Sequence, residues 1–415
     1  MTVVWPAMMP ADARHSAKRI AVGARGHRLA YEDGSSALCA TSGLWNVPLG
    51  YGNATVADAV ARALHDASYL TLFRSVHRPA ERAAEALIGL AGQADYRRVI
   101  FSTSGGAAND AVMKLARQYW AQRGRPERTL VVGLLGSYHG TMYGSHSLSG
   151  DTLLQPLYAL DRRAIRHVSL DDLDELTTLL RREGDRVAAV VVEPVLGSGA
   201  HPLPEATVRV LVELRERYGF LLVADEVATG FARTGPMFAS GTWPERPDLL
   251  VLSKALTNGA MGAAAVLVGP RVSDAFATGG WTFVHGETQA GTPACAAAIL
   301  AVVDELARIG AEATVRRLGE NLRRMAGDLV RDGVASGVRG RGCFLAVTVP
   351  GRTSPVPATG EVSAMVAAIA EAGAIVHPGT DGIQLVPAYD YAGSELSELG
   401  VAIRTGLTRW REGES

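Results

Sequence analysis

Two residues, Lys254 and Asp225, have types and surroundings that could carry out chemistry. Lys254 is the only charged residue between positions 249 and 270, and it directly follows the apolar run LLVLS. An unpaired ammonium in apolar surroundings tends to lose its proton, and the neutral amine is a nucleophile that forms Schiff bases with carbonyl compounds. Asp225 follows a second apolar run, FLLVA. If the two runs are neighbouring parallel strands, the amine and the carboxylate lie at the edge where open α/β sheets bind ligands.

The segments that would position these residues alternate between strand-like and helical patterns. Apolar runs such as RRVIFS, TLVVGLLG, AAVVVEP and FLLVADE are separated by amphipathic patterns such as DDLDELTTLLRREGDRV and TVRVLVELRERYG. This alternation is typical of a doubly wound α/β domain with a mostly parallel sheet. Loops at the carboxyl edge of that sheet would carry Gly105, Tyr138, Glu193, Asp225 and Lys254.

Gly105 and Gly106 follow the run RRVIFS and open a helical pattern. This arrangement directs free backbone N–H groups at a phosphate, although Ser-Gly-Gly also occurs in ordinary loops. Tyr138, in the turn after TLVVGLLG, could stack on a flat ligand, and the alternative is a half-exposed loop tyrosine. The turn has no G-x-G-x-x-G pattern and the chain has no G-K-[ST] sequence, which disfavours NAD and ATP as ligands.

Composition and charge limit the possible ligands and the compartment. The 41 basic and 42 acidic residues give a formal net charge of −1, which argues against nucleic-acid and polybasic membrane surfaces. Cys39, Cys295 and Cys343 are far apart, so we expect neither a disulfide framework nor a metal site. The N-terminal segment has no signal-peptide pattern, and no apolar run approaches the roughly 18 residues of a membrane helix. We expect a soluble, cytoplasmic protein with a small-molecule ligand.

The patterns divide the chain into three expected parts. Residues 1–45 form an N-terminal arm and part of a small domain, with two short strands joined at Asp33-Gly34. Residues 46–300 form a large ligand-binding domain. Residues 301–415 form a smaller α+β domain with a strand at CFLAVTV.

Taken together, these residues are the parts that a pyridoxal 5'-phosphate (PLP) site needs. Lys254 would bind the aldehyde of the cofactor, the glycine turn its phosphate, and Tyr138 its ring. Asp225 would keep the pyridine nitrogen protonated, so that the ring can accept the electron pair of a carbanion. On spacing alone, the competing interpretation is an ordinary surface lysine after a strand.

Ordered motifs cover most of the chain: GLWNVPLGYGN, SGGAAND, SYHGT, EPVLGSGAHPLP, VADEVATGFARTG, PDLLVLSKALTNG and HGETQAGTPACAAA. Through them the chain resembles the class III PLP-dependent aminotransferases, which include ω-amine, ornithine, 4-aminobutyrate and diaminopelargonate aminotransferases. The resemblance implies the α/β architecture of fold type I PLP-dependent transferases. This architecture has a mostly parallel sheet in a large domain and a smaller α+β domain built from both termini.

The resemblance also implies roles for residues around the cofactor. Lys254 matches the Schiff-base lysine, and Asp225 matches the partner of the pyridine nitrogen. Gly105 and Gly106 match the positions whose backbone holds the phosphate, and Tyr138 matches the aromatic residue stacked on the ring.

Two further positions extend this implied site. Val227 matches the residue that presses on the opposite face of the ring. Thr288 matches a threonine that reaches the phosphate bound in the neighbouring subunit, so the resemblance implies a homodimer with two composite active sites. Without the motif, a loop hydroxyl that satisfies its own backbone would be the preferred interpretation of Thr288.

Departures from the family's pattern concern the substrate. Ala107 lacks the usual acidic side chain. Gln384 stands where related enzymes have an arginine that binds a substrate carboxylate, and Ser198 stands where ornithine and 4-aminobutyrate enzymes have a gating glutamate. Trp45 belongs to a segment that lines the substrate cavity in related amine transaminases, and the alternative is a core residue that anchors its loop. We hypothesise that the substrate has no carboxylate at the Gln384 site and is an amine, an aldehyde, a ketone or the end of a larger molecule.

The implied activity is the transfer of an amino group from an amine or amino-acid donor to a carbonyl acceptor by a ping-pong mechanism. A more specific hypothesis is that the chain belongs to the ribosomal-peptide-modifying (daptide-type) kind, which aminates a carbonyl at a peptide terminus. One alternative is a PLP-dependent aminomutase or racemase of the same fold. The other is a non-catalytic, PLP-binding regulatory or assembly protein.

Overall fold

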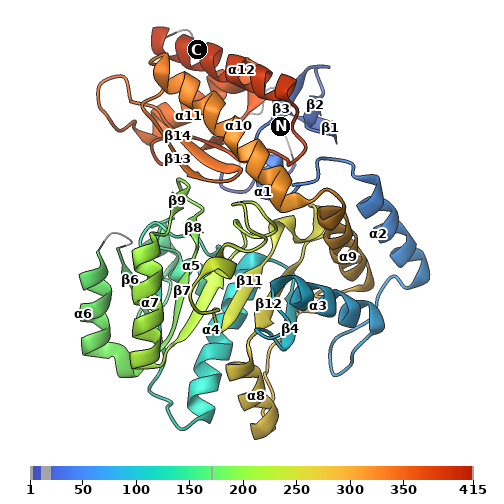
Figure 1. The fold of residues 1–415 in the computed structure, drawn as a ribbon, viewed down its shortest axis with the longest axis vertical. Helices are drawn as coiled ribbons and strands as arrows, with labels where there is room; N and C mark the ends of the chain where they lie inside the picture. Colours follow the sequence, from blue (N-terminus) through green and yellow to red (C-terminus); the bar gives the residue numbers. More distant parts are fainter. Residues whose placement is uncertain (1–2, 11–19, 170–171, 414–415) are drawn as a thin grey trace.

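A seven-stranded sheet forms the centre of the larger part of the molecule (Figure 1). In the computed structural model, which describes residues 3–10, 20–169 and 172–413, the strand order is β4-β12-β11-β10-β7-β5-β6. The strands are β4 (Arg98–Ser102), β5 (Leu130–Leu134), β6 (Ile165–Val168), β7 (Val187–Val192), β10 (Leu221–Asp225), β11 (Leu249–Leu252) and β12 (Ala264–Val268). Within this sheet β12 runs antiparallel to the other six strands. The predicted mostly parallel sheet is therefore confirmed.

Helices cover both faces of this sheet, and among them are α4 (Gly105–Gln122), α6 (Leu173–Glu183), α7 (Glu205–Tyr218) and α8 (Pro270–Gly279). Leu221 and Val223 of β10 pack in one apolar cluster with α4 and α8, whereas Leu222 packs in another with α6 and α7. Alternate strand residues thus face opposite layers. Because both faces are covered, β7 is buried along its whole length, which explains its uninterrupted apolar sequence.

The smaller part contains two four-stranded sheets, β13-β14-β17-β16 and β1-β2-β3-β15. Their strands are β1 (Ala21–Arg25), β2 (Arg28–Tyr31), β3 (Ser36–Cys39), β13 (Gly337–Arg341), β14 (Phe344–Thr348), β15 (Ala374–Ile375), β16 (His377–Pro378) and β17 (Gly382–Leu385). The strand β3 pairs in parallel with β15, so segments from both termini share a sheet. Figure 1 shows α10 (Ala311–Arg331), α11 (Thr359–Glu371) and α12 (Gly393–Glu412) beside these strands.

The remaining elements connect and flank the two parts. They are α1 (Ser42–Trp45), α2 (Ala54–Asp66), α3 (Arg78–Ala91), α5 (Tyr143–Leu148), α9 (Pro293–Arg308), β8 (Val195–Leu196), β9 (His201–Pro202) and the 3-10 turns Gln155–Tyr158, Gly184–Arg186, Ala239–Thr242 and Lys254–Thr257. The expected boundary at residue 300 lies within α9. The division of the chain into three parts stays a prediction.

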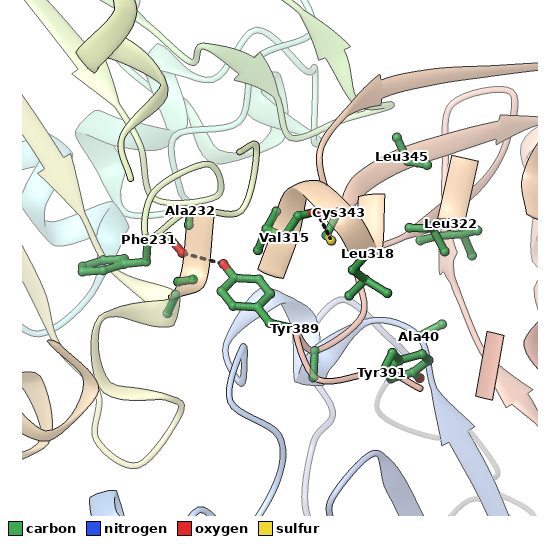
Figure 2. Packing of buried hydrophobic residues seen from close by; sticks show 14 of the residues in the cluster. Ala40, Phe231, Ala232, Val315, Leu318, Leu322, Cys343, Leu345, Tyr389 and Tyr391 are labelled. Carbon is green, nitrogen blue, oxygen red and sulfur yellow. Dashed lines mark hydrogen bonds between the residues drawn. The ribbon is translucent and has the colours of Figure 1, made fainter. Parts of the chain in front are cut away.

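A buried cluster joins the smaller part to the loop that follows β10, and Figure 2 shows part of it. The hydroxyl of Tyr389 donates a hydrogen bond of 2.6 Å to the carbonyl oxygen of Phe231 in that loop. Cys343, at the start of the segment leading into β14, lies in the same cluster with its thiol directed at the Val315 carbonyl oxygen. The loop after β10 is therefore fixed from the side of the smaller part.

Two general features bear on function. Across the described ranges, no helix combines the length and apolar character that crossing a bilayer requires. The same residues include no group of three or more His, Cys, Asp or Glu side chains placed to hold a metal ion.

Candidate active site

A cavity of about 290 Å³ opens at the carboxyl edge of the central sheet. It gathers six of the residues selected from the sequence, namely Gly105, Gly106, Tyr138, Asp225, Val227 and Lys254. They come together because each belongs to a segment that follows a strand of the sheet. Asn109, His139 and Glu193 line the same cavity.

The start of α4 forms one wall of the cavity. Ser104 is the N-cap residue, and its hydroxyl accepts a hydrogen bond of 3.2 Å from the backbone N–H of Ala107. A Cβ on Gly105 would lie 3.1 Å from a methyl group of Val227, and a Cβ on Gly106 would lie 3.3 Å from the hydroxyl of Ser145. Larger residues would crowd this wall. The free N–H groups of the first helical turn can bind a phosphate here.

Asp225 is 2% exposed and is held by three donors. Its Oδ2 accepts hydrogen bonds of 2.7 Å from Asn109 Nδ2 and from His139 Nδ1, and its Oδ1 accepts one of 3.1 Å from the Val227 N–H. Burial opposes a charge on His139, but the hydrogen bond and charge of Asp225 and the charge of Glu193 raise the pKa of His139 overall. The carboxylate is thereby fixed in one orientation, in which it can pair with a protonated ring nitrogen.

Lys254 opens the 3-10 turn after β11. Burial lowers the pKa of its ammonium, an effect that the charges of Glu193 and Asp225 oppose and that of Arg233 reinforces. The Nζ atom lies 4.5 Å from the centre of the Trp45 ring. A lysine in these surroundings has a larger neutral fraction than one in water, and so can act as a nucleophile and as a base.

Glu193 joins two loops around the cavity. Its Oε2 accepts a hydrogen bond from the N–H of Tyr138, and its Oε1 accepts one from the N–H of Gly197, each of 2.9 Å. Complete burial raises the pKa of this carboxyl to about 7. The sequence pattern predicts Glu193 at this edge, but it does not indicate a role for this residue.

Gln384 and Ser198 lie outside the lining of this cavity. The Gln384 side chain is 1% exposed, and its amide donates a hydrogen bond of 2.9 Å to the carbonyl oxygen of Gly197. The Ser198 hydroxyl donates one of 2.8 Å to Oδ2 of Asp151, whose pKa is raised by burial. Ser198 is thus part of the β8–β9 turn, and Gln384 contacts this turn through Gly197.

His377 is a residue that sequence reasoning missed. It lies opposite Gln384 in the β16–β17 pair, and its ring centre is 4.6 Å from that of Trp45. Burial and the charge of Lys254 lower the pKa of its imidazole to about 4. A neutral histidine next to Trp45 was not recognisable from the sequence, because only the register of two short strands brings it there.

Trp45 is the last residue of a left-handed backbone turn. The φ angles of Ser42, Gly43, Leu44 and Trp45 are 40°, 57°, 62° and 66°, so α1 is a left-handed turn. This conformation costs roughly 1–2 kcal/mol for each L-residue other than glycine. The Asn46 amide donates hydrogen bonds to the Gly43 and Leu44 carbonyl oxygens, at 3.0 and 2.9 Å. These hydrogen bonds offset part of the free-energy cost of the left-handed turn.

Thr288 lies apart from the cavity on the surface of the chain. Its carbonyl oxygen accepts a hydrogen bond of 3.0 Å from the hydroxyl of Tyr69. Exposed apolar side chains occur on the neighbouring segments, with Phe73 53% and Val284 78% exposed. A Cβ on Gly286 would lie 3.0 Å from the Phe73 ring, so the two segments share one surface.

The residues of the cavity fit PLP. The glycine wall admits a phosphate at a helix start, where any Cβ would meet a neighbour. Asp225 presents a carboxylate that three donors hold, and Lys254 supplies an amine of lowered pKa. This combination of acid, amine and anion site is the donor set that the cofactor requires.

Comparison with known proteins agrees with this fit. The model of the family described as aminotransferase class III matches residues 9–404. A putrescine–pyruvate aminotransferase of Pseudomonas aeruginosa is 32% identical over 302 residues, which span 68% of this chain and 66% of that protein. An acetylornithine aminotransferase of Xylella fastidiosa is 32% identical over 94% of this chain and 92% of its own length.

A solved structure is similar over almost the whole chain. It is an amine transaminase from an uncultivated Pseudomonas species in the PLP-bound form. Its identity is 29%, its TM-score is 0.92, and the match covers 99% of each chain.

Proposed function

Because the chain belongs to the class III aminotransferase family, whose members depend on PLP, we propose that it transfers an amino group from an amine donor to a carbonyl acceptor that lacks a carboxylate at the Gln384 site. The two half-reactions would use one site alternately, as in a ping-pong mechanism. The observation that carries the substrate part of this proposal is the hydrogen bond from the buried Gln384 amide to the Gly197 carbonyl oxygen.

Bound PLP supplies an electron sink for the carbanion that forms when the reacting carbon loses its proton. The N–H groups at the start of α4 would hold the phosphate, and Tyr138 and Val227, which line the same cavity, would contact the ring. Asp225, whose carboxylate is held by three hydrogen bonds, would keep the ring nitrogen protonated. Lys254 Nζ would remove the proton from the reacting carbon and return it, and the lowered pKa of Lys254 suits it to this role.

Position 384 holds a neutral glutamine rather than a cationic side chain, which supports a substrate that has no carboxylate near this position. A neutral amide cannot replace a guanidinium as a bidentate partner, and this amide already donates to a backbone oxygen. Arg339 lies in the same row of the β13-β14-β17 sheet as Gln384. Its guanidinium donates to both Asp381 oxygens, at 2.6 and 2.7 Å, and to the Gly199 carbonyl oxygen.

The wall beside Lys254 favours a partly apolar substrate. The Trp45 and His377 rings pack there in an edge-on arrangement with their centres 4.6 Å apart, and His377 is neutral at physiological pH. Amines, aldehydes, ketones and the carbonyl at a peptide terminus are chemically compatible with such a wall. A relative named for putrescine, a diamine, is consistent with this class of donor.

A homodimer would complete the site. The exposed apolar residues Phe73, Val76 and Val284 lie on the segments around Thr288, and burying them against a second copy would remove apolar surface from water. In this arrangement Thr288 of one subunit would reach the phosphate in the other.

A half-reaction screen tests the proposal. The PLP-loaded protein is mixed with single amines, including simple monoamines, diamines, alanine, glutamate and 4-aminobutyrate, and the loss of its visible absorbance is followed together with release of the carbonyl product. We expect conversion by amines without a carboxylate. Rapid conversion confined to amino-acid donors would overturn the substrate part. Return of the amino group to the same carbon skeleton would favour an aminomutase or racemase, and no turnover with any donor would favour a non-catalytic role.

A further inference from the structure

Arg233 is a buried arginine whose contacts are with neutral groups. It lies in the loop after β10 and is 1% exposed. One guanidinium nitrogen donates a hydrogen bond of 2.5 Å to the Pro387 carbonyl oxygen, and another donates one of 3.1 Å to the Ser42 hydroxyl. The guanidinium also lies 4.7 Å from the centre of the Tyr389 ring. Burying a charge among neutral partners is unfavourable, and a methionine of similar length would fill the space without this cost. Packing alone therefore does not account for the arginine.

These contacts join three segments that are far apart in the sequence. Arg233 belongs to the larger part, Ser42 to the N-terminal segment, and Pro387 to the segment after β17. The Ser42 hydroxyl donates in turn to the Val386 carbonyl oxygen at 2.7 Å, and the Val386 N–H donates to the Ala40 carbonyl oxygen at 2.7 Å. The Tyr389 hydroxyl closes the junction by donating to Phe231 (Figure 2).

The junction lies at the first residue of the left-handed turn Ser42–Trp45. Backbone conformations of this kind persist only where their surroundings fix them. At the other end of the turn, the centre of the Trp45 ring lies 4.5 Å from Lys254 Nζ and 4.6 Å from the centre of the His377 ring. The position of this wall therefore depends on how firmly Ser42 is held.

We propose that Arg233 is a positioning residue that holds the left-handed turn Ser42–Trp45, and through it the Trp45 ring, beside Lys254. The planar guanidinium suits this role because its fork of donors reaches Pro387 and Ser42 at the same time, whereas a lysine ammonium is a single point of attachment. Arg233 does not touch the reacting groups, and its effect on them passes through Trp45.

Arg128 offers a matched control. It is 4% exposed, donates to the carbonyl oxygens of Val187 and Tyr218 at 2.9 and 2.7 Å, and lies 4.1 Å from the Trp120 ring. It thus repeats the chemistry of Arg233 with other segments. Val187 begins β7, so Arg128 lies at the opposite edge of the sheet from the cavity.

Hydrogen exchange tests the role without any assumption about catalysis. The backbone amides of Trp45 and Val47 donate to Thr41 and Ser42 within the turn. In Arg233→Met, we expect peptides covering residues 41–48 to exchange at least about tenfold faster than in the wild type, whereas Arg128→Met leaves them unchanged. Ser42→Ala removes only the hydroxyl that accepts the hydrogen bond from Arg233, and it should also accelerate exchange of residues 41–48. Unchanged exchange of residues 41–48 in Ser42→Ala and in a folded Arg233→Met would overturn the proposal, and so would equal acceleration in Arg128→Met.

A double-mutant cycle tests the link to Trp45 and rests on the proposed function. We expect Arg233→Met to lower kcat/KM for the best amine at least about tenfold and Arg128→Met to leave it unchanged. Adding Arg233→Met to Trp45→Ala should then have little further effect, because both act on one wall. Fully additive losses would overturn the positioning role. If the wild type itself transfers no amino group, the proposed function fails, while the exchange measurement still decides the role of Arg233.

Discussion

His139 donates a hydrogen bond of 2.7 Å from Nδ1 to Oδ2 of Asp225, and both buried side chains line the cavity. The imidazole and the Asn109 amide leave the carboxylate little freedom to turn. A charge held in one orientation stabilises a partner without reorganisation during the reaction. The fixed Asp225 carboxylate is therefore oriented to pair with a positive charge at one position, and in our proposal that charge is the protonated ring nitrogen.

Asp225→Asn should lower kcat of the half-reaction on the order of 10²–10³-fold, because an amide cannot balance the charge of the ring nitrogen. Cofactor binding should persist, since the glycine wall at α4 is unchanged. Single-turnover absorbance with a saturating amine measures the rate, and equilibrium dialysis measures the retained cofactor. A rate within a few-fold of the wild type would show that Asp225 has another role.

Lys254→Ala should abolish the visible absorbance of the lysine-bound cofactor and reduce turnover to background. The nucleophile and the proton carrier are then both missing. Lys254→Arg is the matched control, because a guanidinium keeps a positive charge near Trp45 but does not form a Schiff base with the cofactor. Normal turnover in either variant would refute the role of Lys254.

The positions of these residues could be predicted from the sequence because one topological rule governs them. Lys254 and Asp225 each follow an apolar strand, and parallel strands end at a common edge. The hairpin at Asp33-Gly34 and the strand at CFLAVTV are likewise confirmed as β2–β3 and β14, since turn residues and apolar runs are local signals.

The surroundings of Trp45, His377 and Gln384 could not be predicted in this way, because no local sequence pattern indicates them. The contact of Trp45 with Lys254 depends on a left-handed turn that includes three residues other than glycine, and no local pattern predicts such a turn. His377 reaches Trp45 through a strand of two residues. Gln384 could be compared with the family's arginine, but its hydrogen bond to Gly197 depends on the packing of two separate parts of the chain.

Gln384→Arg should improve the use of substrates that carry a carboxylate. A guanidinium that reaches the carboxylate forms charge-assisted hydrogen bonds worth about 1.5–3 kcal/mol, which corresponds to a decrease in KM of about tenfold or more. Gln384→Leu serves as the control, because it removes the amide without adding a charge. Steady-state kinetics with glutamate and with a matching amine measure the change. An equal effect on both substrates would place Gln384 outside the substrate site.

The His27 side chain should make stability depend on pH. Burial lowers its pKa, but hydrogen bonds and charges from Asp390 and Glu395 raise it overall to about 9 from 6.5. A raised folded-state pKa gives a contribution that is complete below about pH 6.5 and is lost as the pH rises through about 9. Allowing for solvent around the exposed Asp390, we expect a loss on the order of 1–2 kcal/mol. Thermal unfolding between these pH values should show this slope in the wild type and not in His27→Gln.

Val284→Asp should convert a dimer into a monomer and weaken PLP binding. Val284 is 78% exposed and belongs to the segment that leads to Thr288, so a charge there would oppose burial against a second copy. Val356→Asp is the control, because Val356 is 64% exposed but lies in the smaller part, between β14 and α11. Analytical ultracentrifugation gives the mass, and cofactor titration gives the affinity. A monomeric wild type with normal PLP affinity would refute the composite site, whereas a monomeric Val284→Asp of lower affinity would support the contribution of Thr288 from a second subunit.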